Sequence, residues 1–399
     1  MRSDFDAVII GGGPAGATAA ILLAQGGWSV ALVEKQEFPR RKVCGECVAA
    51  PNLPLMERLG ITDSFDRLAG AELREVGLML GQRTVTAALP ALHKCTYPWG
   101  RALAREHLDS LLLNRSRQVG VHVMQPWTVN SVDGGPGDFV CSVTSADTGE
   151  SASLISPIAI AASGSWGHQP FLPGAKPPHK PGDLLGFKAN FRQADLRPGL
   201  LPVLSFPGGY GGMVRAGDDV LTLACCLRRD ALQACRQKFP RANAGESVEA
   251  YLRAACRGVE QALGKAERQG GWLSAGPLHP GIRVHQSSDG PLLVGNAAGE
   301  AHPIIGEGIS MAMQSALLLS QRLLQQDKMD GQTFEAVRKG YAREWRRRFA
   351  PRLRLAAVFA HLAMRPQLNG LLLPFIAQWP GLLTCGAYFS GKVSSPVSP

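Results

Sequence analysis

AVIIGGGPAGATAA (residues 7–20) is an apolar run followed by a glycine-rich turn and the start of an alanine-rich helix. Gly11 permits a tight turn after the strand, Gly13 lets the backbone approach a pyrophosphate, and Gly16 lets the helix pack closely on a sheet. The free N–H groups at a helix start, with the helix dipole behind them, bind phosphate charge. Pro14 suits the first helical turn, where its missing N–H is no loss. The stretch predicts the turn of a dinucleotide-binding βαβ unit.

A second apolar strand is predicted at residues 29–33, and it is followed by Glu34. This acidic residue lies about 20 residues after the glycine turn, where a carboxylate can accept a hydrogen bond from a ribose hydroxyl. A lone G-x-G-x-x-G is weak evidence, but here strand, helix, second strand and acidic residue occur in register. We therefore expect Glu34 to bind the ribose of the dinucleotide.

The chain has 399 residues, enough for two domains or for one large domain with insertions, and a net charge of +10. Positive charge is concentrated at residues 338–354, which hold eight Lys or Arg and one acidic residue. Such a block indicates either an anionic partner or the solvated face of a helix. We slightly favour the solvated helix face. Nucleic acid is not expected, because no recognised nucleic-acid module accompanies the charge. Peripheral contact with a membrane remains one of the interpretations of this basic segment.

The same basic segment has an apolar residue every fourth position, at Tyr341, Trp345, Phe349 and Leu353. That spacing predicts a helix with one stripe packed on the body of the protein. The consecutive residues 346–348 are all arginines and cannot all lie on that stripe, so some of them are expected to be exposed.

Nine cysteines are scattered without the spacing of zinc ligands, which predicts a reduced, cytoplasmic protein without a metal site. No signal peptide is recognised, and no run of about 18 apolar residues predicts a membrane span. The stretch that comes closest to such an apolar run, residues 371–383, is interrupted by Pro374 and Pro380.

Periodicity predicts helices at residues 54–68, 105–119, 247–263 and 309–324. Strands are predicted at 122–132, 139–143 and 155–162, and a further set forming one sheet at 184–191, 203–206, 213–215 and 220–226. Prolines cluster between residues 170 and 181, which indicates a crossing into another domain.

Two further segments carry a resemblance to a known family. Residues 295–308 read GNAAGEAHPIIGEG after a short apolar strand, and residues 38–46 read FPRRKVCGE. Together with the glycine turn, and with Arg105 at an R-x-x-L-D helix start, they resemble the FAD-dependent family of p-hydroxybenzoate hydroxylase-type monooxygenases, geranylgeranyl reductases and flavin-dependent halogenases. Residues 187–189 and 206–212 resemble more closely bacterial biosynthetic-cluster flavoproteins that accompany quinone-cofactor amine oxidases or type III polyketide synthases.

The resemblance implies an α/β fold, in which a Rossmann-like FAD-binding domain of the p-hydroxybenzoate hydroxylase type carries an inserted β-sheet substrate domain and a helical C-terminus. The FAD-binding domain is expected at residues 1–75, 98–168 and 275–330, the substrate domain at 76–97 and 169–274, and the helical segment at 331–399. The residues implied to bind FAD are Gly11, Gly13, Pro14, Ala15, Gly16, Glu34, Lys35, Arg40, Gly45, Arg105, Val129, Asn296, Gly306, Gly308 and Ile309.

Two departures from the family pattern concern the cofactors. Asn296 replaces the family's Asp, so it can hydrogen-bond to the ribityl chain without contributing charge. Residues 162–167 read ASGSWG where classical hydroxylases carry Asp-Gly followed by Arg. The resemblance allows NAD(P)H as the electron donor, but this departure argues against its direct use. The W-x-W-x-I-P motif of halogenases is absent, which argues against halogenation.

The resemblance implies a monooxygenase that hydroxylates an aromatic or quinol-like biosynthetic intermediate through a flavin C4a-hydroperoxide. The cofactor performs the difficult step, while the protein orients the substrate and excludes water. One alternative is a reductase that saturates C=C bonds of a prenyl or polyene chain, because the acid-free, apolar C-terminus would help to admit a lipid. Another is a flavoprotein maturation partner that docks on a protein substrate, which an exposed apolar patch beside the flavin entrance would favour.

Three residues are candidates for catalysis. His302 is placed near the flavin by the family pattern and can transfer a proton near neutral pH, or it is an ordinary loop histidine. Tyr210 lies between two pairs of glycines and either faces the substrate or fills a corner of a sheet. Cys44 forms a C-x-x-C pair with Cys47, and we favour a packing role in the flavin loop over redox chemistry.

Overall fold

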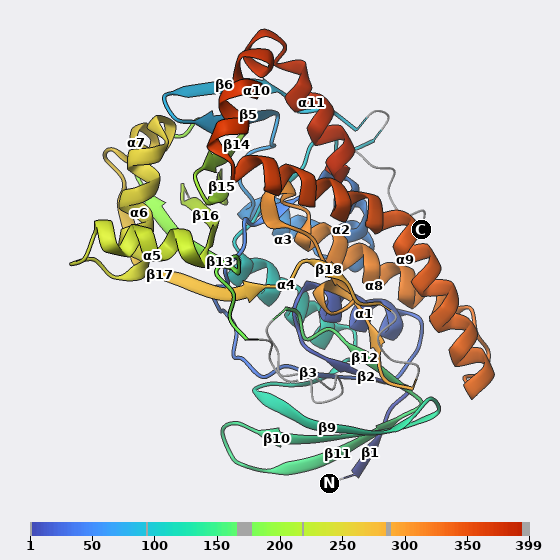
Figure 1. The fold of residues 1–399 in the computed structure, drawn as a ribbon. Coiled ribbons are helices and arrows are strands. Elements are labelled where there is room, and N and C mark those ends of the chain that lie inside the picture. The colour runs from blue at the N-terminus through green and yellow to red at the C-terminus, as the bar shows by residue number, and fades with distance from the viewer. Residues whose placement is uncertain (1, 93–94, 166–177, 218, 285–288, 393–399) are drawn as a thin grey trace.

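The predicted strand–turn–helix–strand unit forms the centre of a parallel sheet in the computed structural model of the protein (Figure 1). The structure describes residues 2–92, 95–165, 178–217, 219–284 and 289–392. β2 (Ala7–Ile10), α1 (Pro14–Gln25) and β3 (Val30–Val33) follow one another, and the strand order is β19-β12-β2-β3-β8. All these strands run parallel. β2 and β3 are buried on both faces, as parallel strands covered by other layers are, which explains their unbroken apolar sequences.

The other strands of this sheet come from distant parts of the chain. They are β8 (His122–Met124), β12 (Ile158–Ala161) and β19 (Leu292–Leu293). The expected strands at 122–132 and 155–162 are each broken at a proline, so each contributes to two different sheets. Pro126 and Pro157 cannot donate a backbone hydrogen bond, which explains why the ladder ends there.

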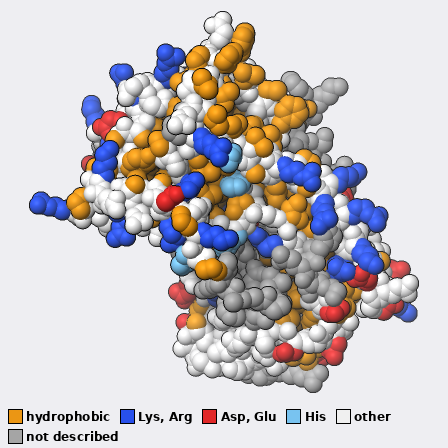
Figure 2. Space-filling view, in the orientation of Figure 1, with side chains coloured by type: hydrophobic (Ala, Val, Ile, Leu, Met, Phe, Trp, Pro, Cys, Tyr) orange, Lys and Arg blue, Asp and Glu red, His pale blue; other side chains and the backbone are white. Residues whose placement is uncertain are grey.

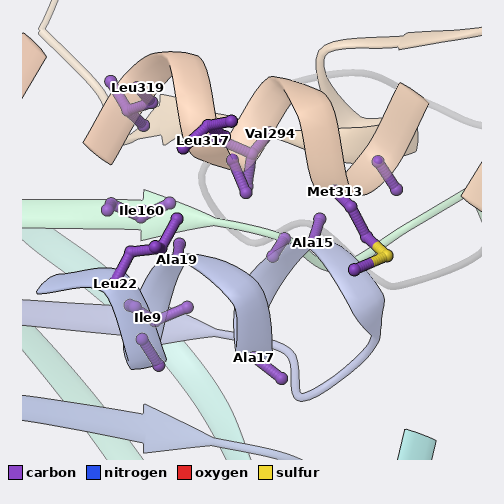
Figure 3. Packing of buried hydrophobic residues seen from close by; sticks show 14 of the residues in the cluster. Ile9, Ala15, Ala17, Ala19, Leu22, Ile160, Val294, Met313, Leu317 and Leu319 are labelled. Atoms are coloured by element: carbon purple, nitrogen blue, oxygen red, sulfur yellow. The ribbon is translucent and has the colours of Figure 1, made fainter. Parts of the chain in front are cut away.

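Helix α1 packs against α8 (Gly308–Leu324) and against α4 (Arg105–Gln118) beside the parallel sheet. Figure 3 shows how apolar side chains fill the space between these helices and the strands, among them Ala15, Ala19, Leu22, Ile9, Ile160, Met313 and Leu317. A Cβ on Gly16 would lie 1.9 Å from the carbonyl oxygen of Gly11, so a glycine is required where the helix starts this close to the strand. The packing role predicted for Gly16 is confirmed.

A four-stranded sheet lies on the other side of the parallel one, in the order β1-β11-β10-β9 (Figure 1). Its strands are β1 (Arg2–Asp4), β9 (Trp127–Gly135), β10 (Asp138–Ser145) and β11 (Ser151–Ser156). Cys141, Val143 and Leu154 of this sheet form a common core with Val8 and Val33 of the parallel sheet.

The strands predicted to form one sheet do so, within a seven-stranded sheet of order β17-β13-β16-β15-β14-β5-β6. The strands are β5 (Glu75–Leu80), β6 (Arg83–Ala88), β13 (Leu184–Arg192), β14 (Leu200–Phe206), β15 (Gly209–Arg215), β16 (Leu221–Arg228) and β17 (Glu267–Leu278). Helices α5 (Arg229–Lys238), α6 (Ala244–Ala255) and α7 (Arg257–Leu263) pack along it, so the helix expected at 247–263 is two helices. The domain boundaries themselves stay a prediction, and part of the proline cluster, residues 170–177, lies outside the described residues.

The C-terminal part is helical, with α9 (Gly331–Ala363), α10 (Pro366–Gln378), α11 (Gly381–Ala387) and a final turn η4 (Tyr388–Lys392). The predicted stripe of α9 is confirmed, because its four apolar residues are buried, while Arg346 and Arg347 are exposed. Among the described residues no single helix is long and apolar enough to span a membrane. Gly370–Gln378 and Gly381–Lys392 pass that test only as a pair bent by 103°.

The remaining elements are short and connect the layers. They are η1 (Ala50–Asn52), α2 (Leu53–Leu59), α3 (Thr62–Leu68), β4 (Cys47–Val48), β7 (Arg101–Ala102), β18 (Gly281–Ile282), β20 (Gly299–Glu300), η2 (Gly295–Ala297) and η3 (Pro303–Ile305). The helix expected at 54–68 is therefore α2 followed by α3, with Gly60 in a left-handed conformation between them.

Candidate functional site

A cavity of about 470 Å³ lies between the carboxyl ends of β2 and β12 and the seven-stranded sheet. Ligands of open α/β sheets bind at the carboxyl ends of the strands. The cavity wall includes the glycine turn before α1, a loop at residues 42–47, parts of β14 to β16, the loop before α8, and helices α10 and α11. The predicted site residues that line it are Gly13, Pro14, Ala15, Cys44, Gly45, Arg105, Tyr210, Asn296, His302, Gly306, Gly308 and Ile309.

The start of α1 faces this cavity without a side-chain cap, with Gly13 as its N-cap residue. A Cβ on Gly13 would have only Arg105 Nη2 nearby, at 3.9 Å, so the space in front of the turn is open. Gly11 has a φ of +108°, as the tight turn requires, and lies behind the cavity wall together with Gly16. The geometry matches the roles that the sequence assigned to the three glycines.

Positive side chains gather beside this helix start. Lys42 and Arg105 line the cavity, and Asp109 fixes Arg105 through contacts of 2.6 Å at Nε and 2.7 Å at Nη2. Burial, and then the charges of Arg105 and Arg40, lower the pKa of Lys42 to about 8. A pyrophosphate between these cations and the helix start would relieve their mutual repulsion. The residues present therefore fit the dinucleotide that the sequence predicts.

Glu34, which is expected at the ribose, and the predicted cofactor-binding residues Lys35, Arg40 and Val129 are not part of the cavity wall. Glu34 is buried, and its carboxylate accepts hydrogen bonds from the backbone N–H groups of Gly12 at 2.7 Å and Gln36 at 2.8 Å. Arg40 Nη2 lies 3.8 Å from the same carboxylate. Val129 is half-buried on β9, which starts beside Glu34, whereas Lys35 is exposed. The structure thus gathers Glu34, Arg40 and Val129 at one end of the site, and their contacts with the cofactor stay a prediction.

One buried ion pair was not foreseen. The Glu46 carboxylate accepts hydrogen bonds from Lys188 Nζ, from Thr222 Oγ1 and, at 3.0 Å, from the backbone N–H of Arg105. It ties the loop at residues 42–47 to β13 and β16 of the seven-stranded sheet. The available signal was a lysine inside the apolar stretch GFKANF (186–191), since lysine is almost never fully buried unless paired.

The segment at residues 295–308 forms the part of the site next to the start of α1, where a Cβ on Gly295 would lie 2.8 Å from the Cβ of Ala15. Asn296 Nδ2 donates to Ser165 Oγ at 2.8 Å, and that hydroxyl donates to Glu300 Oε1 at 2.8 Å. Gly306 adopts a left-handed conformation, and α8 then begins at Gly308 without a side-chain cap or an acidic residue in its first turn. This bare helix start on the cavity wall can stabilise negative charge on a bound group.

A second unforeseen ion pair lies behind the start of α8. Lys392 Nζ contacts Glu307 Oε1 at 3.0 Å, and both side chains are largely buried. Burial lowers the pKa of Lys392, but the charge of Glu307 outweighs it and holds that pKa above its ordinary value. A local sequence pattern could not have predicted this ion pair, because the two residues are far apart in the chain. The final turn of the described chain therefore closes this side of the cavity.

Two of the three candidate catalytic residues lie together. Tyr210 OH lies 3.3 Å from His302 Nδ1, and both residues line the cavity. Burial raises the pKa of Tyr210 well above 10 and lowers the pKa of His302 below 6.5. Both side chains are therefore neutral at pH 7. The pair can exchange a hydrogen bond with a polar group of a ligand.

The third candidate, Cys44, is half-buried on the cavity wall apart from this pair. Cys44 and Cys47 are both free thiols, and burial is the main cause that raises the pKa of Cys47 to about 11. A thiol with a raised pKa is a poor nucleophile at neutral pH, so Cys47 is not activated for redox chemistry. The role of Cys44 stays a prediction. Within the described ranges, no group of His, Cys, Asp and Glu could hold a metal ion.

The profile of one protein family, described as an FAD binding domain, matches residues 4–353. A tryptophan 2-halogenase from Chondromyces crocatus is 26% identical over 339 residues, which cover 80% of this chain and 60% of that protein. The chain thus spans less than two thirds of the length of that relative. The family profile includes both the glycine turn and residues 295–308.

Solved structures show the same fold. The myxobacterial chondrochloren halogenase superposes with a TM-score of 0.75 at 19% identity, covering 100% of this chain and 98% of that chain. A geranylgeranyl bacteriochlorophyll reductase-like protein from Thermoplasma acidophilum gives 0.72 at 18% identity, covering 95% and 92%. The predicted α/β class, with a Rossmann-like nucleotide-binding part and a helical C-terminus, is confirmed.

Proposed function

This chain belongs to the FAD binding domain family, and on that premise we propose that it is a monooxygenase that hydroxylates an aromatic or quinol-like compound. The observation that carries the proposal is the neutral Tyr210–His302 pair on the cavity wall. FAD, when bound, supplies two-electron transfer and the activation of molecular oxygen. The pyrophosphate would be held by the start of α1 with Lys42 and Arg105.

The pair gives the protein a way to move a proton at the substrate. A ring that bears a hydroxyl group becomes a better nucleophile when that hydroxyl loses its proton. Neutral His302 can accept this proton, and the 3.3 Å contact with Tyr210 holds the imidazole in place. Such proton transfer contributes about 10²- to 10⁴-fold to the rate.

The rest of the cavity wall suits an apolar ring. Leu78, Val203 and Met213 contribute apolar side chains from the seven-stranded sheet, and Leu383 contributes one from α11. Such a wall excludes water from the reacting centre, which protects oxidised intermediates from side reactions.

The test is the source of the oxygen in the product. Chemically reduced holoprotein is mixed with simple phenols and quinols, either under ¹⁸O₂ or without oxygen. The masses of the products are then determined by mass spectrometry. A hydroxylated product that carries one ¹⁸O atom and requires oxygen supports the proposal. Parallel reactions with added bromide and chloride matter because the relatives include halogenases, and a halogenated product would overturn it.

A reductase for C=C bonds is the second candidate, and the extension of the apolar wall onto α10 and α11 favours it. Leu372 and Ile376 of α10 line the cavity with α11, so a chain longer than one ring has apolar contacts available. The same assay with a polyene as substrate separates the two candidates. If the polyene is still converted under nitrogen with a chemical reductant, the protein is a reductase, because oxygen is then not a reactant.

The proposal also includes the electron donor, the kind of substrate and the cellular compartment. NAD(P)H stays a candidate donor, tested by whether NADH or NADPH bleaches the bound flavin without another protein. The substrate is a small aromatic or lipid-like compound, either free or presented by a protein. The nine free thiols support a reducing compartment, and we propose the cytoplasm.

A further inference from the structure

The last two helices expose a continuous apolar surface. Leu371 and Phe375 of α10 and Trp379, the residue that follows the helix, recur every fourth position and are 70%, 57% and 58% exposed. Leu382 of α11 and Phe389 of η4 add exposed fractions of 51% and 63%. Figure 2 shows an orange patch over α10 and α11 at the top of the molecule. Folded monomers rarely expose so many large apolar side chains together unless the surface binds something.

The same helices form part of the cavity wall. On α10, Leu372 and Ile376 line the cavity, and Leu372 is itself 40% exposed beside the exposed Leu371 and Phe375. On α11, Leu382 both lines the cavity and is half exposed. The apolar surface outside is therefore continuous with the apolar interior.

The charges on α9 and on the turn into α10 are mostly positive. The exposed Lys and Arg residues there are Lys339, Arg343, Arg346, Arg347, Arg354 and Arg365. No Asp or Glu occurs from Trp345 onward. Figure 2 shows blue side chains below and beside the orange patch, along the course of α9. An apolar helix face beside a basic helix is the composition of a segment that lies in the interface of an anionic bilayer.

We propose that α10 and α11 dock on an anionic lipid surface, with Leu371, Phe375 and Trp379 in the interface, and that a lipid-soluble substrate enters the cavity between them. Trp379 suits this position, because tryptophan is enriched at the level of lipid headgroups. Because the two helices are bent by 103°, they do not form one straight span, and the proposal places them on the surface of the bilayer. The entry route rests on the proposed function, whereas the lipid contact does not.

A protein partner fits this surface less well. Protein interfaces outside permanent complexes are only about as apolar as the average surface, and they carry about one hydrogen bond per 100–200 Å². The exposed stripe of α10 offers only Leu, Phe and Trp side chains, and a tryptophan indole is the one donor among them. A bilayer interface requires no matching set of polar groups.

The experiment is co-sedimentation of the holoprotein with vesicles of phosphatidylcholine alone or with an equal part of phosphatidylglycerol. We expect binding to the anionic vesicles at about 0.1 M salt and a marked decrease at about 1 M, where charges are screened within about 3 Å. The variant L371S/F375S/W379S changes exposed side chains only, so it should keep FAD. Its vesicle binding should fall about tenfold or more, because the inserted apolar area is lost.

Matched variants separate charge, insertion and folding. R354Q/R365Q should weaken binding at low salt, whereas R236Q/K238Q, which removes two exposed charges from α5, should not. W379F should still bind, but its tryptophan emission should lose the quenching by brominated lipids that the wild type shows.

Two results would overturn the proposal. One is the absence of binding to both kinds of vesicle at low salt. The other is a dimer in the ultracentrifuge that L371S/F375S/W379S abolishes, which would assign the surface to a second copy of the chain. If the protein binds anionic vesicles but forms no oxygen-dependent product, the proposed function fails while the lipid contact stands.

Discussion

At the scale of single residues, a side chain added at Gly13 would meet the open cavity rather than the protein. A Cβ there has no close protein neighbour, so Gly13→Val should fold. The added methyl groups occupy the approach to the pyrophosphate, and we expect protein without bound FAD. The measurement is the flavin absorbance per protein chain. Gly271→Val, at an exposed position with equally open surroundings, should retain FAD. Stoichiometric FAD in Gly13→Val would contradict the assignment.

Glu34 should contribute to affinity more than to catalysis. Glu34→Ala removes charge-assisted hydrogen bonds worth about 1.5–3 kcal/mol, which corresponds to a rise of about ten- to a hundredfold in the Kd for FAD. It also leaves the N–H groups of Gly12 and Gln36 without their acceptor, so a lower melting temperature is expected as well. Fluorescence titration of apoprotein measures the Kd, with the exposed Glu37→Ala as control. An unchanged Kd would remove Glu34 from the ribose site.

His302 should determine the acidic side of the activity profile. Burial lowers its pKa below 6.5, so the neutral, proton-accepting form persists to more acidic pH than in a free histidine. Activity should therefore persist to more acidic pH than a free histidine would allow and then fall as His302 gains a proton. The fold should follow the same direction, because the buried cation is disfavoured. His302→Gln should lower kcat/KM by about 10²-fold or more and abolish this limb, and a limb that persists in the variant would exclude His302.

At the scale of elements, the start of α8 depends on the final turn of the chain. Lys392→Met leaves Glu307 buried without its closest cation, at a cost of about 3 kcal/mol in the free energy of unfolding. Urea denaturation measures this loss. The double variant Glu307→Gln/Lys392→Met should recover most of it, because neither charge is then stranded. A double variant no more stable than Lys392→Met would show that the two charges do not act as a pair.

At the scale of the whole molecule, FAD should act as a structural component. The cavity wall comes from segments between Gly13 and Lys392, so bound cofactor joins parts that are otherwise held by side chains alone. Removing FAD should lower the melting temperature, and free FAD at 100 times its Kd should restore about 2.7 kcal/mol. The check is calorimetry of apoprotein with increasing FAD, and a melting temperature independent of FAD would contradict this view.

Local patterns in the sequence predict the parts of the molecule that local physics determines. The glycine turn, the α9 stripe and strands β13 to β16 of the seven-stranded sheet follow from spacing and apolar periodicity, whereas β5, β6 and β17 were not predicted. The breaks at Pro126 and Pro157 were missed, because an apolar run does not show which sheet each half joins. The pairs Glu46–Lys188 and Glu307–Lys392 were missed for a related reason, since each joins residues that only the finished fold brings together.

The mixed origin of the parallel sheet has a consequence for the newly made chain. The glycine turn leaves the ribosome before β12 and β19, which complete its sheet, and long before Lys392. A nascent chain therefore carries the glycine turn for much of its synthesis without the rest of the pocket. We expect stable capture of FAD only after the C-terminal helices have been translated.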